Sequence, residues 1–226
     1  MNSNRSLVWL LLVALICLDG AGWAVSKKKL PDKKKKPKEK EVVTKIISQK
    51  DFEDAVQKFA QDDRLPVASS TLVEKGRGAA YYAVDKLVDD DPETFWAEGA
   101  SGPGGNEWVT FVLPIGTTHL DIIPGAGKEQ FQNFNRPKEM FLDVYQVKLK
   151  RKDEAYKLKA KYIGRTVFEF DDKPQLLRKK LETKLPDVVG ADRILYVGVL
   201  IIDKVYKGQF DDTALSQINT SIIYGE

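Results

Sequence analysis

Cysteine, histidine and methionine are scarce in this 226-residue sequence, which has one Cys, one His and two Met. Cys17 lies in an apolar N-terminal segment that we predict below to be a signal peptide, so the mature chain would have no thiol. Disulfides, thiolate nucleophiles and cysteine-rich zinc sites are then excluded. His119 alone cannot form a site of several imidazoles, and any Ser-His-Asp triad would have to include it. The composition therefore disfavours most nucleophile-dependent enzymes.

Excess positive charge is confined to one segment. Lys27 to Lys40 contains nine Lys and two acidic residues. Without this segment and the residues before it, 26 basic side chains face 30 acidic ones. A nucleic-acid-binding domain normally has its positive charge on the folded part. We therefore expect no specific nucleic-acid partner.

The N-terminus has the layout of a signal peptide, predicted over residues 1–24. Arg5 precedes an apolar run at 7–18, and small residues, Gly22 and Ala24, occupy −3 and −1 of a cleavage point. The run is shorter than the ~20 residues of a membrane-spanning helix. An uncleaved anchor is the alternative. Export without cysteines indicates a bacterial periplasm, cell surface or exterior.

Residues 25–47 are predicted to be a disordered basic tether, because Lys27 to Lys40 is rich in like charges and lacks apolar periodicity. It would either contact an anionic surface or serve as a solvated spacer.

Residues 48–62 predict a short amphipathic helix over Gln49 to Gln61. Ser48 and Asp51 form an N-terminal capping pattern, and Pro66 prevents continuation. One apolar face would dock on the following domain. Its residues are Phe52, Ala55, Val56, Phe59 and Ala60.

Residues 66–226 predict an all-β domain, an antiparallel β-sandwich. Alternation indicates a strand at 108–113 and a hairpin over 145–162, and residues 194–202 are apolar throughout, as in a strand buried on both faces. Further short strands are expected around Phe168 and Phe170, at 218–224 and at His119. Trp96 and Trp108 are expected in the core.

Four segments resemble the discoidin-like, galactose-binding-type family. Residues 85–96 are similar to its "L-x-D-G-D-x-x-T-x-W" corner, with Asp90 where Gly is usual, and 104–109 are similar to "G-x-G-E-W-I". Residues 133–138 (NFNRPK) and 203–218 resemble the branch associated with bacterial NAD-glycohydrolase translocation modules. The resemblance implies a jelly-roll sandwich whose loops at one end bind a ligand, and a binding module that is not an enzyme.

The acidic corner suggests a structural calcium. Carboxylates close in sequence supply the oxygens that calcium prefers, and the resemblance implies a further ligand from the C-terminal motif, where this chain has the neutral Gln217. The candidate ligands are Asp89, Asp91, Thr94 and Gln217. A turn capped by its own carboxylates is the alternative.

A glycan or envelope polysaccharide is the leading predicted ligand. Phe131 and Phe134 lie in a loop rich in Gly, Asn and Gln, where a ring could stack on a sugar while amides bind its hydroxyls. Alternatively, Arg136 and Pro137 brace the start of a strand. The candidate site residues are Tyr81, Tyr82, Glu98, Asn106, Gln130, Phe131, Asn133, Asn135 and Arg136.

A lysine-rich face on the predicted hairpin gives a second hypothesis. Binding of an anionic polymer (acidic polysaccharide, lipopolysaccharide or nucleic acid) or of a protein partner is one interpretation, and a solvated, aggregation-resistant strand edge is the other. The residues are Lys148, Lys150, Lys157, Lys159 and Lys161. A hydrolase that uses Glu98 and Glu107 is a third, less favoured hypothesis.

Overall fold

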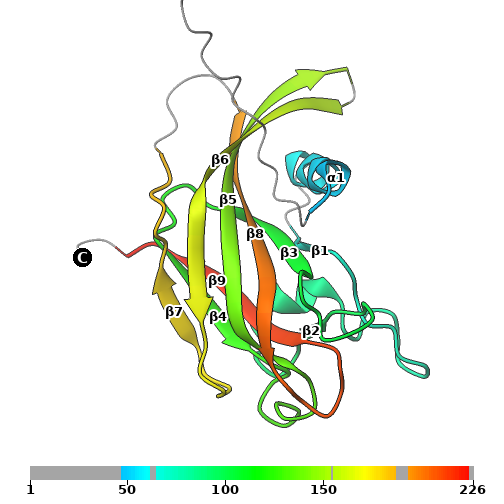
Figure 1. The fold of residues 1–226 in the computed structure, drawn as a ribbon. Helices are drawn as coiled ribbons and strands as arrows, with labels where there is room; N and C mark the ends of the chain where they lie inside the picture. The colour runs from blue at the N-terminus through cyan, green and yellow to red at the C-terminus, as the bar shows by residue number, and fades with distance from the viewer. Residues whose placement is uncertain (1–46, 62–64, 154, 187–192, 224–226) are drawn as a thin grey trace, which may run out of the picture. The chain divides into compact units, whose positions relative to one another are not determined.

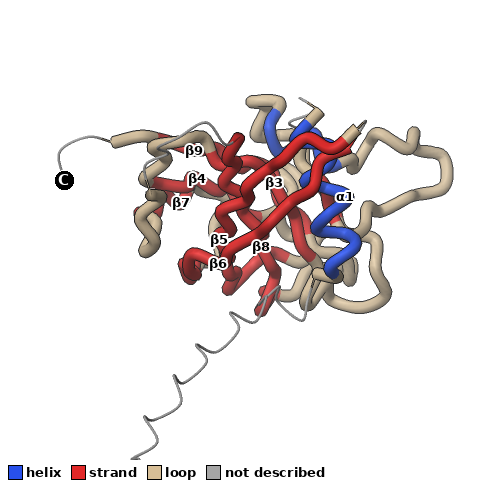
Figure 2. Tube along the Cα trace, turned by 90° about the horizontal axis from the view of Figure 1, so that it is seen from above, coloured by secondary structure: helices blue, strands red, loops and turns tan. Residues whose placement is uncertain are grey.

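A computed structural model describes residues 47–61, 65–153, 155–186 and 193–223. The predicted signal peptide and nearly all of the tether lie outside the described residues. Two antiparallel sheets pack face to face, and one α-helix covers the outer face of the larger sheet (Figures 1 and 2). The predicted antiparallel β-sandwich with a short N-terminal helix is confirmed. No helix in the described part is long and apolar enough to cross a membrane.

The larger sheet has five strands in the order β1-β3-β8-β5-β6. Their bounds are β1 Val67–Ala68, β3 Trp108–Leu113, β8 Arg193–Tyr206, β5 Arg136–Lys152 and β6 Ala155–Glu169. The smaller sheet has four strands in the order β2-β9-β4-β7. Their bounds are β2 Trp96–Ala97, β9 Ala214–Ser221, β4 His119–Pro124 and β7 Leu177–Lys180. A 3₁₀ helix, η1, spans Val84–Val88.

Two strand predictions need correction. Phe168 belongs to the long strand β6 and Phe170 follows its end, so the two residues form no separate strand. The last strand begins at Ala214, four residues before the predicted start at Ile218. Both errors arise because long strands in a twisted sheet bury some positions on each face, which hides simple alternation.

The middle of β8, from Tyr196 to Ile202, is buried on both faces, which explains its uninterrupted apolar sequence. Tyr196, Leu200 and Ile202 join the core between the two sheets, whereas Val197 and Val199 face the helix. The predicted core positions Trp96 and Trp108 are buried as well.

Helix α1 (Gln49–Ala60) begins as predicted. The Ser48 hydroxyl accepts a hydrogen bond from the Asp51 backbone N–H at 3.1 Å. The predicted apolar face is buried against β3, β5, β6 and β8, and the rings of Phe52 and Tyr145 are 5.1 Å apart. Ile47, the last residue of the predicted tether, is also buried in this cluster, so it belongs to the folded region.

A second link fixes α1 to the β5–β6 hairpin. The Gln57 amide donates to the Tyr156 carbonyl at 2.6 Å, and the Tyr156 N–H donates to the Gln57 carbonyl oxygen at 3.2 Å. This pairing satisfies the outward-facing backbone groups of Tyr156 in edge strand β6.

We expect Phe59→Ala to destabilise the domain by about 3–5 kcal/mol, because a fully buried ring is removed and a cavity is left. The free energy of unfolding in urea measures this change. The exposed neighbour Lys58 is the control, and Lys58→Ala should change stability by less than about 0.5 kcal/mol. Equal effects of the two substitutions would contradict the docking of α1.

Candidate functional site

Four loops meet at one end of the sandwich. Loops 69–83 and 98–107 are joined by hydrogen bonds from the Gly99 N–H to the Ser70 hydroxyl at 3.0 Å and from the Ser69 hydroxyl to the Glu107 carboxylate at 2.6 Å. The Gln209 and Phe210 N–H groups of loop 207–213 donate to carbonyls at 132 and 133 in loop 125–135. Hydrogen bonds of backbone and side chains thus hold neighbouring loops together.

Glu98 clamps two of these loops from inside. Its carboxylate is fully buried and accepts the N–H groups of Ala100 at 2.8 Å and Thr213 at 3.0 Å. Burial raises the pKa of Glu98 to about 6, against the lowering effect of these two donors. A Cβ at Gly104 would lie 2.6 Å from this carboxylate, so only glycine fits there. Glu98 supports the loop surface from beneath.

Arg136 and Asn135 are also buried. The Arg136 guanidinium makes a bidentate pair with Asp172 at 2.8 Å and donates to the carbonyls of Phe134 and Lys207. The Asn135 amide bonds to the Asp211 carbonyl and accepts the Gly208 N–H. These bonds agree with the second interpretation of Arg136, that it braces the start of β5.

The expectation that Phe131 and Phe134 are exposed loop aromatics is wrong. Their exposed fractions are 4% and 2%. The Phe131 ring packs beneath the Arg136 guanidinium, at 5.2 Å, and against Gly125, where φ is +84°. The glycine and amide residues that suggested a solvated loop form tight turns that fold around these rings.

A row of aromatic rings crosses the loop end and emerges at both sides. Tyr81 packs on Tyr82 at 4.7 Å, Tyr82 on Phe134 at 5.8 Å and Phe134 on Phe210 at 5.3 Å. The inner rings are buried, whereas Tyr81 is 43% exposed and Phe210 is 49% exposed. Two partly exposed aromatic residues thus lie at the ends of a packed aromatic base.

Charged groups hold the Tyr81 end of this row. The Arg77 guanidinium lies 4.2 Å from the centre of the Tyr81 ring and pairs with Glu74 at 2.6 Å. The Tyr82 hydroxyl donates to the same carboxylate at 2.8 Å, and burial, followed by this bond, raises the pKa of Tyr82 to about 12. Tyr81 therefore has a fixed orientation beside a partly exposed cation.

Sequence reasoning identified Tyr81 and Tyr82 but missed Arg77 and Phe210. Phe210 is the one large apolar residue in the polar segment 207–212, and an isolated aromatic of this kind is a usable signal. Asn106 is exposed, and Gln130 and Asn133 are half-buried at the same loop end. Their side chains form no hydrogen bond with another residue of the described part.

The acidic corner does not fit a calcium ion. The Asp89 carboxylate accepts the Asp91 N–H and the Thr94 hydroxyl, and Asp91 accepts the Glu93 N–H. The Gln217 amide points its N–H₂ toward Asp90. Among the described residues, no three Asp, Glu, His or Cys side chains form a group suited to a metal. The geometry is that of a turn capped by its own carboxylates.

The proposed hydrolase residues have structural partners. Glu107 accepts the hydroxyls of Ser69 at 2.6 Å and Ser70 at 2.5 Å, and Glu98 accepts two backbone N–H groups as described above. His119 is buried in β4, as expected for a structural residue, with its Nδ1 2.8 Å from the Thr118 hydroxyl.

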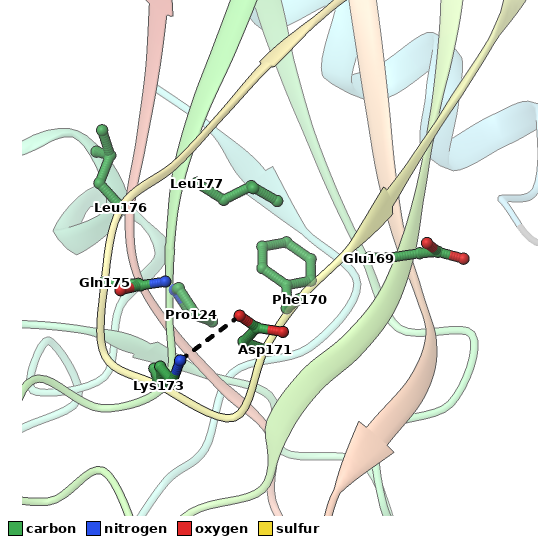
Figure 3. Close-up of a pocket in the computed structure, with 8 residues that line it drawn as sticks. All are labelled: Pro124, Glu169, Phe170, Asp171, Lys173, Gln175, Leu176 and Leu177. Atoms are coloured by element: carbon green, nitrogen blue, oxygen red, sulfur yellow. Dashed lines mark ion pairs between the residues drawn. The ribbon is translucent and has the colours of Figure 1, made fainter.

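A shallow hollow of about 150 Å³ lies between β6 and β7 (Figure 3). It contains the Asp171–Lys173 ion pair at 3.8 Å, and Phe170, its aromatic member, is only 6% exposed. The hollow therefore offers polar groups without an accessible ring face, unlike the row from Tyr81 to Phe210. The residues that line it are Pro124, Glu169, Phe170, Asp171, Lys173, Gln175, Leu176 and Leu177.

The five predicted hairpin lysines do share one exposed face. The register of β5 and β6 places Lys148 opposite Lys159 and Lys150 opposite Lys157, with Lys161 opposite Gln146. All five are exposed.

The family model of the NAD glycohydrolase translocation F5/8 type C domain matches residues 61–221. The chain belongs to this family. The match agrees with the family resemblance in the sequence and with the double-sheet architecture described above.

The solved structures that match this chain share little sequence with it. An F5/8 type C domain from Bacteroides fragilis has 12% identity and a TM-score of 0.42, over 69% of this chain and 88% of that one. The C-terminal domain of a chitobiase from the same organism has 18% identity and a TM-score of 0.37, over 70% of this chain and 95% of that one. A mutant of arabinofuranosyltransferase AftD from Mycobacteria has 16% identity and a TM-score of 0.45. The match covers 70% of this chain but only 11% of the transferase. No curated protein matches the sequence.

Glu98 should make stability depend on pH. Because its folded pKa of about 6 lies above the ordinary value of 4.5, its contribution is fully present below pH 4.5 and is lost as the pH rises through 6. The free energy of unfolding should fall by about 2 kcal/mol from this group. Urea titrations at several pH values measure this change, and Glu98→Gln should remove this part of the pH dependence. An identical pH profile for the two proteins would refute the assignment.

Calcium should have no effect on stability. We expect the melting temperature to be unchanged, within about 1 °C, by EDTA or by added calcium, because the carboxylates of the acidic corner are already bonded within the turn. Thermal unfolding of the full chain measures this. A rise of several degrees with calcium would show that the corner is a metal site.

Proposed function

We propose that this protein is an exported, non-catalytic binding module that recognises a glycan through the loop end of its sandwich. The observation that carries the proposal is the row of edge-to-face rings that ends in two partly exposed residues, Tyr81 and Phe210. Membership of an F5/8 type C domain family supports it. Export is inferred from the predicted signal peptide, and a cell-envelope polysaccharide is the proposed source of the glycan.

Sugar recognition requires a flat apolar surface beside polar groups. The C–H face of a pyranose packs on an aromatic ring, while its hydroxyls exchange hydrogen bonds with charged and amide side chains. Tyr81 and Phe210 supply the rings. Arg77 lies against the first ring, and Asn133 belongs to the loop that bonds the second.

The loop end is rigid before a ligand arrives. Glu98, Asn135 and Arg136 hold the loops from inside, and Tyr82 and Phe134 hold the outer rings. A preformed site of this kind loses little conformational entropy on binding. The buried residues of the predicted site thus act by positioning Tyr81 and Phe210.

The test is a glycan array probed with the full mature protein and with Tyr81→Ala and Phe210→Ala variants. Loss of one stacking surface should weaken binding about 5- to 20-fold for each variant. Tyr162→Ala is the matched control, because Tyr162 is 40% exposed but lies on β6, away from the loop end. It should bind like the unmodified protein.

Two results would overturn the proposal. One is the absence of any retained glycan on the array. The other is unchanged binding by both loop variants, which would place the ligand elsewhere. Circular dichroism of each variant establishes that the fold is intact.

A further inference from the structure

The β5–β6 hairpin extends beyond the end of the sandwich. In Figure 1 it projects past the neighbouring strands at the end opposite the loop surface, and no strand of the described four-stranded sheet covers its inner face. The inner face continues from Gln146, whose amide donates to the Tyr196 hydroxyl at 3.0 Å at the border of the core. Beyond this point the face consists of lysines.

The lysines form a two-row ladder. Directly opposed residues in an antiparallel pair have Cβ atoms roughly 5 Å apart, and alternate residues along a strand are roughly 7 Å apart. The pairs Lys148–Lys159 and Lys150–Lys157 are therefore like charges at short range. Among the described residues, Lys150, Lys157, Lys159 and Lys161 form no ion pair. Residues 145–162 contain seven basic side chains against two acidic ones.

The face of the hairpin opposite the lysines packs against α1, and this packing stabilises the hairpin despite the repulsion between the lysines. Tyr145, Val147 and Leu149 pack beneath α1, and the Gln57–Tyr156 bonds attach the helix to the hairpin. Like charges directly opposed across a strand pair are destabilising. The packing of α1 offsets this repulsion, so the lysines are held in register and ready for an anionic ligand.

We propose that this lysine ladder is a second binding surface, which takes a linear acidic polysaccharide. A polymer with regularly spaced carboxylates can contact both rows at once. The large aliphatic residues of the described hairpin, Val147, Leu149 and Leu158, lie on the helix side, so the ladder offers no such side chain for insertion into a bilayer. It also lacks an aromatic ring for stacking nucleic-acid bases. The ladder therefore offers positive charge without apolar or aromatic groups, and this combination favours a polyanionic sugar chain.

Polygalacturonate is a suitable probe, because it is a linear polymer with one carboxylate on each residue. Surface-immobilised full-length protein should bind it at low salt and lose about 10- to 100-fold in affinity between 50 and 200 mM salt, as expected when several lysines displace counterions. The variant Lys150→Gln, Lys157→Gln, Lys159→Gln and Lys161→Gln should lose at least about tenfold in affinity at low salt.

The control variant has the same change in net charge at exposed lysines outside the ladder. It carries Lys50→Gln, Lys58→Gln, Lys128→Gln and Lys173→Gln, and it should bind polygalacturonate within about twofold of the unmodified protein. Neutral dextran should not bind to the ladder. The Tyr81→Ala and Phe210→Ala variants should retain polygalacturonate binding, so failure of this proposal is distinguishable from failure of the loop-end proposal.

Three outcomes would overturn the inference. The first is no binding of polygalacturonate at low salt, and the second is equal loss in the ladder and control variants. The third is stronger binding to oligothymidylate or to phosphatidylglycerol vesicles than to polygalacturonate, which would assign the ladder to nucleic acid or to a lipid surface.

Discussion

Burial of β8 on both of its faces is the constraint on which the rest of this structure depends. The smaller sheet covers one face and α1 covers the other, so the apolar run from Tyr196 to Ile202 has no solvated side. A sandwich sheet ordinarily leaves its outer face to water. Here the outer face needs the helix, and the helix in turn makes the long hairpin beside β8 stable enough to project from the domain.

The loop end is held together by buried polar side chains and not by apolar packing alone. Polar side chains are buried there, and each is matched to backbone groups of a neighbouring loop: Glu98 to Thr213, Asn135 to Gly208 and Arg136 to Lys207. A buried polar group without a partner would be strongly unfavourable, so these pairings permit essentially one arrangement of the loops. That arrangement determines which aromatic rings are buried and which reach the surface.

The regular elements could be predicted from sequence because their signals are local. The Ser48 cap, the apolar face of α1 and the alternating lysines of the hairpin each depend on neighbours a few residues away. The family resemblance added the sandwich architecture. The burial of Phe131 and Phe134 could not be predicted in this way. Phe134 packs on Tyr82 and Phe210, and the Arg136 guanidinium over Phe131 is held by Asp172, and these three partners come from other parts of the chain. Composition described that loop as solvated because tight turns and exposed loops use the same residues.

Strand β5 begins at Arg136, beneath the loop surface, and carries Lys148 and Lys150 near its other end. At about 3.3 Å per residue, roughly 45 Å of continuous strand separates the two regions. Two ligands held at these ends would not collide or compete. A single copy of the domain could therefore crosslink two polymer chains, a task that otherwise requires a dimer or a tandem repeat of binding modules.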